Sequence, residues 1–175
     1  MVSMETIFAS MRPMSRNLQE DHCAADPPTS ALEVHLGYWL RLVSNEVSRV
    51  FERELQKRDI SVAEWAAINL LAAGTGLTPA KLAAAMGMTR GAISKVLGKL
   101  EAKKLVSRAV SPLDNRVQLL TLTKQSRRIL PRLGHIADGN DRHFFAALNL
   151  DEKAALRNLL QKVAAAHQMS RVPVE

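Results

Sequence analysis

The chain has 175 residues, of which 47% are hydrophobic and only 4% aromatic, which fits one domain built from aliphatic helices better than a β-sandwich. Its formal net charge of +7 favours a polyanionic partner such as nucleic acid or an acidic lipid surface. A single cysteine, Cys23, rules out an intrachain disulfide, and no apolar segment is long enough to span a membrane, so a cytoplasmic protein with no membrane partner is expected.

Residues 1–30 are rich in methionine, end in polar residues after two prolines, and are predicted to be an N-terminal extension outside the core. Charged residues interrupt this stretch, so it lacks the apolar centre of a signal peptide. From Ala31 the apolar residues recur at helical spacing and predict one long amphipathic helix to about Lys57. Its apolar positions are Leu32, Leu36, Trp39, Leu40, Val43, Val47, Val50, Phe51 and Leu55.

Three helices and a hairpin are predicted next. A capping box at 61–64 begins a helix that ends at Gly74. A threonine–proline pair starts a short helix over 80–86, and Thr89 caps a further helix that extends to about Lys103. The hydrophobic period then changes to two, which predicts strands at 106–110 and 117–122 joined by a turn at 111–115.

Two helices are predicted after the hairpin. Thr123 caps the first, in which Pro131, Gly134 and Gly139 predict a kink or a break. A second capping box at 149–152 begins the last helix. Its apolar positions are Leu156, Leu159, Leu160 and Val163.

This order predicts a mainly α fold, a winged helix-turn-helix with a two-stranded β-hairpin wing, flanked by N- and C-terminal dimerisation helices. The DNA-binding lobe is expected at 58–123 and a helical dimerisation region at 31–57 and 124–169. A homodimer is expected because one small lobe can hardly bury both long apolar stripes.

Positive charge is concentrated in residues 86–132, which hold eleven basic and only two acidic residues, a net charge of +9. The rest of the chain sums to −2, so the basic excess coincides with the predicted helix and wing, as expected of a surface that binds phosphates. The basic residues are Arg90, Lys95, Lys99, Lys103, Lys104, Arg108, Arg116, Lys124, Arg127, Arg128 and Arg132.

The helix that Thr89 caps has an apolar face and a polar face that contains two glycines. Each glycine costs about 1 kcal/mol of helix stability, which makes sense if this face must approach another surface closely, as a recognition helix does in the major groove. Arg90 and Lys95 suit guanine acceptors, and Thr89 and Ser94 suit phosphates or base edges. The predicted DNA-binding residues of this helix are Thr89, Arg90, Gly91, Ser94, Lys95 and Lys99.

Asp114, Asn115 and Arg116 lie at the predicted hairpin tip and complete the DNA-binding set. An arginine on a β-wing is well placed for the narrow, electronegative minor groove. A carboxylate two residues away is expected to hold the guanidinium in one orientation, which lowers the entropy lost on binding.

The run from Leu82 to Leu122, with "TRGAISKVLGKLEAKKLVSR", "DNR" and "LTLT", resembles the multiple-antibiotic-resistance-regulator (MarR) family, and the resemblance extends over about residues 31–167. It implies an obligate dimer with interlocked first and last helices, a base-reading recognition helix and a wing. The sequence departs from the family pattern at four positions. They are Lys104 and Ser126 where glycine is usual, Asn115 where a second arginine is common, and Pro131 in a long helix.

The other candidate sites have simpler explanations. The five histidines are scattered, and no metal-binding spacing, phosphate loop or nucleophile motif is present, so no enzyme, metal or cofactor is expected. Cys23 is better explained as an inert thiol than as an oxidant sensor. His35, Trp39 and Trp65 line either a pocket for a small aromatic or anionic effector or simply the packed core.

The sequence therefore predicts a sequence-specific double-stranded DNA-binding transcriptional regulator, a homodimeric repressor on a pseudo-palindromic operator that a small effector releases. The alternative is a winged-helix interaction module that binds protein or RNA through its basic face.

Overall fold

The computed structural model describes residues 31–169 except 75 and 113, so the N-terminal extension and Cys23 lie outside the described residues. The described residues fall into two units with the boundary after Tyr38. The first contains η1 (Leu32–Val34) and the start of α2 (Leu36–Gln56). The predicted helix thus begins later than Ala31, because His35 has extended backbone angles and η1 buries no residue that could stabilise an earlier start.

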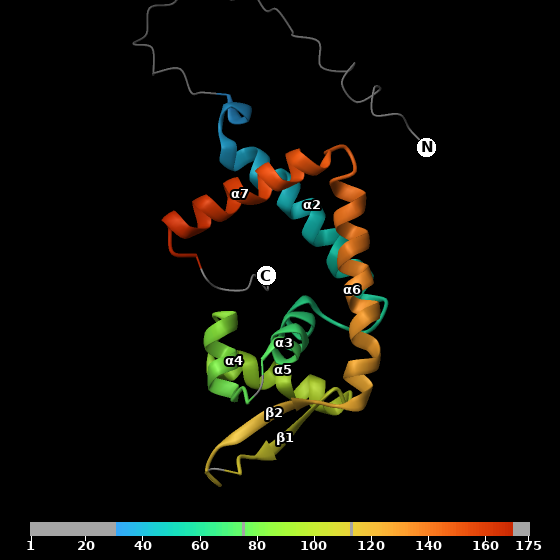
Figure 1. Cartoon of the computed structure of the whole chain (residues 1–175), viewed down its shortest axis with the longest axis vertical. Helices are drawn as coiled ribbons and strands as arrows, with labels where there is room; N and C mark the ends of the chain where they lie inside the picture. Colours follow the sequence, from blue (N-terminus) through green and yellow to red (C-terminus); the bar gives the residue numbers. More distant parts are fainter. Residues whose placement is uncertain (1–30, 75, 113, 170–175) are drawn as a thin grey trace, which may run out of the picture. The chain divides into compact units, whose positions relative to one another are not determined.

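The second unit contains a winged helix-turn-helix (Figure 1). Its helices are α3 (Val62–Ala73), α4 (Pro79–Met86) and α5 (Arg90–Ala102). Strands β1 (Val106–Val110) and β2 (Gln118–Leu122) form an antiparallel hairpin. The predicted caps are confirmed: the capping box at 61–64 begins α3, and the hydroxyl oxygens of Thr78 and Thr89 accept backbone N–H bonds at the starts of α4 and α5.

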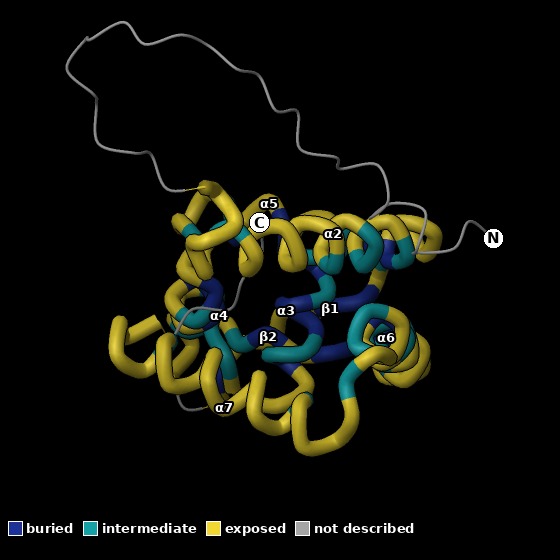
Figure 2. Tube along the Cα trace, turned by 90° about the horizontal axis from the view of Figure 1, so that it is seen from above, coloured by how far each residue is buried: buried dark blue, intermediate teal, exposed yellow. Residues whose placement is uncertain are grey.

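The core lies among α3, α4, α5 and the base of the hairpin (Figure 2). Leu82, Leu97 and Leu100 are fully buried, and so are Leu55 of α2 and Ile68 of α3. Since every third or fourth residue of α5 from Ile93 onward is held in this core, the opposite face of α5 is fixed toward solvent.

Helix α6 (Lys124–Phe144) is one continuous helix, so the predicted break is wrong. Pro131 cannot donate to the carbonyl of Arg127, but both residues are exposed and water can satisfy that carbonyl. The opposite side of α6 stays packed through buried Leu133 and Asn140, whose Nδ2 donates to the carbonyl of Val47 at 3.2 Å.

The corner between α5 and β1 has a left-handed residue, Lys104, with φ of 57°. Its N–H donates to the carbonyl of Glu101 and the next N–H donates to the carbonyl of Leu100, a helix-ending pattern in which glycine would be less strained. Two hydroxyls from the start of α6 hold the corner: Thr123 Oγ1 donates to the Lys104 carbonyl at 2.8 Å, and buried Ser126 donates to the Leu105 carbonyl. The two departures from the glycine pattern, Lys104 and Ser126, thus meet at one corner.

Helix α7 (Leu150–Ala166) begins at the predicted Asn149–Glu152 capping box and buries none of its residues. Its apolar side chains and those of the first half of α2 are largely exposed (Figure 2). Neither these nor any other helix in the described part of the chain is long and apolar enough to cross a membrane.

Candidate nucleic-acid interface

The outer face of α5 is polar, cationic and open. Arg90, Gly91, Ser94, Lys95 and Lys99 are all exposed, as the sequence predicts. A Cβ added at Gly91 or at Gly98, the two glycines of this face, would meet nothing within 4 Å. No contact within the chain therefore requires these glycines, and a close approach by an external surface would explain them.

A groove of about 530 Å³ connects α5 with the wing. It brings together Arg90 and Ser94 of α5 with Arg116 of the wing. Lys95, Lys99, Asp114 and Asn115 do not line it. The other lining residues are Thr78, Pro79, Ala80, Ile93, Leu97, Arg108, Val117 and Gln118.

The N-terminus of α4 also lines this groove, which was not predicted from the sequence. Thr78 and Ala80 place the first turn of α4 on the groove wall, where the backbone N–H of Ala80 and the positive end of the helix favour a phosphate, since Pro79 has no N–H and that of Lys81 is bonded to Thr78. The threonine–proline cap at 78–79 was the available signal, because it marks where this helix begins.

The carboxylate of Asp114 has a different role from the predicted one. Its Oδ1 accepts a hydrogen bond from the backbone N–H of Arg116 at 2.9 Å, and its carbonyl accepts from the N–H of Val117. Among the described residues, no bond joins this carboxylate to the Arg116 guanidinium. Asp114 therefore fixes the turn from which Arg116 extends, and it does not fix the guanidinium itself.

Two of the eleven basic residues are used inside the chain. Lys103 Nζ lies 2.9 Å from Oε1 of the buried Glu64 and also contacts the carbonyl of Asp59. Arg108 on β1 pairs with Glu101 of α5. The count of cations available to phosphates therefore falls from eleven to nine.

The predicted effector residues are not gathered into one described pocket. His35 belongs to the first unit and Trp39 to the second. Trp65 packs edge-on against Phe51, with ring centroids 4.9 Å apart, and its indole nitrogen is buried without a hydrogen-bond partner in the described part of the chain. Phe51 lies twelve residues, or about 18 Å of helix, beyond Trp39. The effector site stays a prediction.

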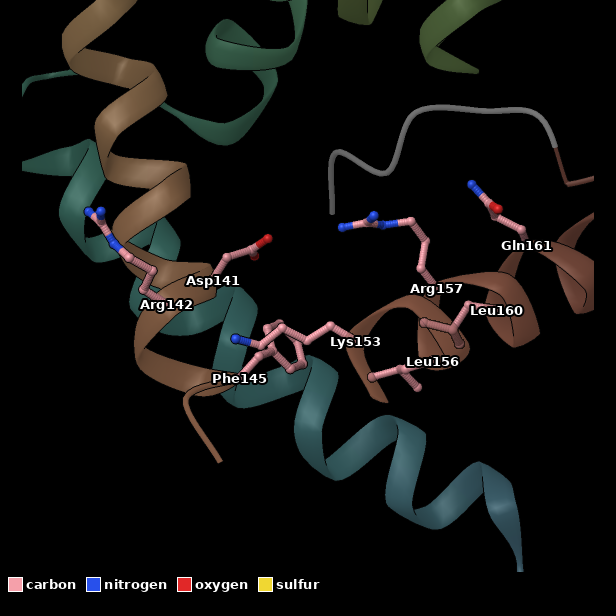
Figure 3. A pocket seen from close by; sticks show the side chains of 8 residues that line it. All are labelled: Asp141, Arg142, Phe145, Lys153, Leu156, Arg157, Leu160 and Gln161. Carbon is pink, nitrogen blue, oxygen red and sulfur yellow. The ribbon is translucent and has the colours of Figure 1, made fainter. Parts of the chain in front are cut away.

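A second groove, of about 330 Å³, lies between the end of α6 and α7 (Figure 3). Phe145, Leu156 and Leu160 give it an apolar surface, and its basic lining residues are Arg142, Lys153 and Arg157. No group of three or more His, Cys, Asp or Glu residues in the described ranges is arranged to hold a metal ion.

Comparisons with known proteins agree on one family. The MarR family model matches residues 58–116. The chain is 30% identical over 132 residues to the multiple antibiotic resistance protein MarR of Escherichia coli, covering 74% of this chain and 91% of that protein.

Two solved structures with DNA are also similar. A mutant of E. coli MarR complexed with operator DNA has a TM-score of 0.65 at 26% identity, over 73% of this chain and 92% of that one. The transcriptional repressor CouR bound to a 23-mer DNA duplex has a TM-score of 0.70 at 26% identity, over 80% and 99%. The chain belongs to the MarR family of transcriptional regulators, and its winged helix-turn-helix is the fold of that family.

Proposed function

We propose that this protein is a sequence-specific duplex-DNA-binding regulator, a homodimeric repressor on a pseudo-palindromic operator. The observation that carries the proposal is the groove in which Arg90 and Ser94 of α5 meet Arg116 of the wing and the N-terminus of α4. Each wall of this groove fits one part of duplex DNA. Helix α5 fits the major groove, Arg116 of the wing fits the minor groove, and the N-terminus of α4 fits a phosphate.

The proposed dimer is supported by the exposed apolar side chains of α2 and α7. Leu40 of α2 is 55% exposed and Leu159 of α7 62%, so apolar side chains of both helices lie largely outside the core of the described chain. A second copy would cover them, which assigns 31–57 and 124–169 to dimerisation and 58–123 to DNA. Two-fold symmetry then calls for two half-sites about one helical turn apart.

Salt dependence tests the proposal. Four exposed cations of the helix and wing, Arg90, Lys95, Lys99 and Arg116, can neutralise about four phosphates per subunit. A dimer should therefore show a log–log slope of the association constant against salt of about −7 or steeper, whereas a monomer with the same contacts gives about −3.6. Light scattering on the same sample gives the mass. A slope shallower than about −2 would mean that the basic face does not bind DNA.

The alternative, a module that docks protein or RNA, is favoured less. Its docking face would be expected to expose large apolar side chains, whereas the outer face of α5 exposes arginine, lysine, serine and glycine. Equal affinity for operator, random duplex and folded RNA in the salt titration would favour this alternative.

We infer further that an aromatic anion acts as effector near Trp65, whose buried indole N–H is a donor without an acceptor in the described chain. Benzoate should release the duplex from the wild-type protein, and Trp65→Phe, which keeps the ring and removes the donor, should require more benzoate. Identical benzoate titrations of the two proteins would exclude Trp65 as the contact.

A further inference from the structure

Helix α6 has four exposed cations on the face that points away from the core. They are Lys124, Arg127, Arg128 and Arg132, called the α6 stripe below. The buried residues of α6 are Ser126, Leu133 and Asn140. At about 100° per residue, the two sets lie on opposite sides of the helix. None of the four residues lines the groove between α5 and the wing.

The stripe has no acidic residue to balance it. The sequence contains no Asp or Glu between Asp114 and Asp138. Among the described residues, no hydrogen bond or ion pair engages any of the four side chains. Elsewhere this chain does pair its cations: on α2, Arg49 lies 2.5 Å from Glu46 and Lys57 lies 2.6 Å from Glu54.

This arrangement is unfavourable for the isolated helix. Lys124 and Arg127 are close to the N-terminus of α6, where the helix dipole favours acidic residues and where the first turn has none. Lys124 and Arg128, and again Arg128 and Arg132, are like charges four residues apart, which repel each other on one helix face. Four basic residues that lower the stability of their own helix in this way indicate that the stripe has a role in binding.

We propose that the α6 stripe is a second phosphate-binding surface, which contacts the backbone of duplex DNA outside the groove that reads the bases. The inference rests on the proposed function. The stripe extends over about 12 Å, and a duplex of that length carries about seven phosphates. Arginine and lysine contacts to phosphates carry no sequence information, so the stripe adds affinity without base preference.

Duplex DNA is the favoured occupant because the stripe, although it lies in the region assigned to dimerisation, begins directly after the wing of the proposed DNA groove. Helix α6 begins one residue after β2, and its buried Ser126 is bonded to the corner where α5 ends. An acidic protein would offer the same charge, and the experiment separates the two partners.

The test compares two double variants that each remove two charges. Arg127→Gln/Arg128→Gln removes half of the stripe. The α2 variant, Arg53→Gln/Arg58→Gln, removes two exposed cations, one in the last turn of α2 and one just after the helix. Binding to a random-sequence duplex is measured across salt concentrations. For the stripe variant, the slope of log affinity against log salt concentration should be shallower by about 1.8 per subunit, and the α2 variant should keep the wild-type slope. The ratio of operator to random affinity should be unchanged.

Thermal unfolding gives an independent measurement. The stripe variant should melt at or above the wild-type temperature, because it removes repulsion; a lower Tm would mean that the arginines stabilise the fold. The proposal is overturned if the salt slope of the stripe variant equals that of the wild type, or if the slope becomes shallower by the same amount in both variants. Lost binding to polyglutamate with an unchanged DNA slope would assign the stripe to an acidic protein. If the wild type itself shows no steep slope, the proposed function fails first.

Discussion

Lys103→Met should destabilise the protein by about 3 kcal/mol and leave the salt dependence of DNA binding unchanged. Lys103 lies at the end of α5 among residues expected to contact phosphates, yet its ammonium group is the counter-ion of Glu64. The Glu64 side chain is only 2% exposed, and its two oxygens lie 2.9 and 3.1 Å from Lys103 Nζ. Removal of Lys103 leaves a buried carboxylate without its counter-ion, which is the costly way to break such a pair.

The matched control is Lys99→Met on the same helix. Lys99 is exposed and lies one turn earlier. Its loss should change stability by no more than about 0.5 kcal/mol but make the salt slope shallower by about 0.9 per subunit. Urea unfolding and duplex titrations measure both quantities. A shallower salt slope for Lys103→Met would mean that Lys103 does contact a phosphate.

A double variant checks the cause of the lost stability. Glu64→Gln removes the charge but keeps an oxygen that can accept the Ser61 N–H, a bond of 2.8 Å in the capping box. Glu64→Gln/Lys103→Met should therefore recover much of the stability that Lys103→Met loses. No recovery would mean that the Lys103 side chain stabilises the fold through packing or through its contact with Asp59.

At the wing, Arg116→Ala should weaken operator binding by about 1.5 to 3 kcal/mol per subunit without changing the unfolding midpoint. Arg116 is exposed and contributes to the groove wall, so the folded chain loses little when its side chain is removed. Arg53→Ala, an exposed arginine of α2, is the control and should leave binding unchanged. Equal effects of the two substitutions would reduce Arg116 to an ordinary surface charge.

Asp114 separates loop geometry from charge. Asp114→Ala should weaken binding by about 1 kcal/mol, because the turn loses the bond to the Arg116 N–H, although a negative charge beside a polyanion is removed. Asp114→Asn keeps an acceptor for that bond and removes the same charge, so it should bind at least as tightly as the wild type. If both variants bind more tightly, electrostatic repulsion dominates and the turn does not need the carboxylate.

The sequence by itself determined the order of the helices and strands in the second unit. Each helix start in the second unit is marked by a residue whose side chain bonds the first backbone N–H groups, as at Ser61, Thr89 and Asn149. These signals act within four residues, so they can be recognised without the fold. The same holds for the outer face of α5, which follows from helical periodicity once the apolar face is known.

Only the tertiary structure decided which charges are available and which contacts they make. Lys103 and Glu64 are 39 residues apart, and Lys103 resembles its neighbour Lys104 until the fold brings α3 against α5. The continuity of α6 through Pro131 likewise depends on which side of the helix packs. The convergence of Arg90, Arg116 and the start of α4 on one groove joins two consecutive helices with the wing, which follows later in the sequence. Helical periodicity predicts on which face of a helix a residue lies. The energy of an ion pair depends on distance and burial, which are set only when the chain packs.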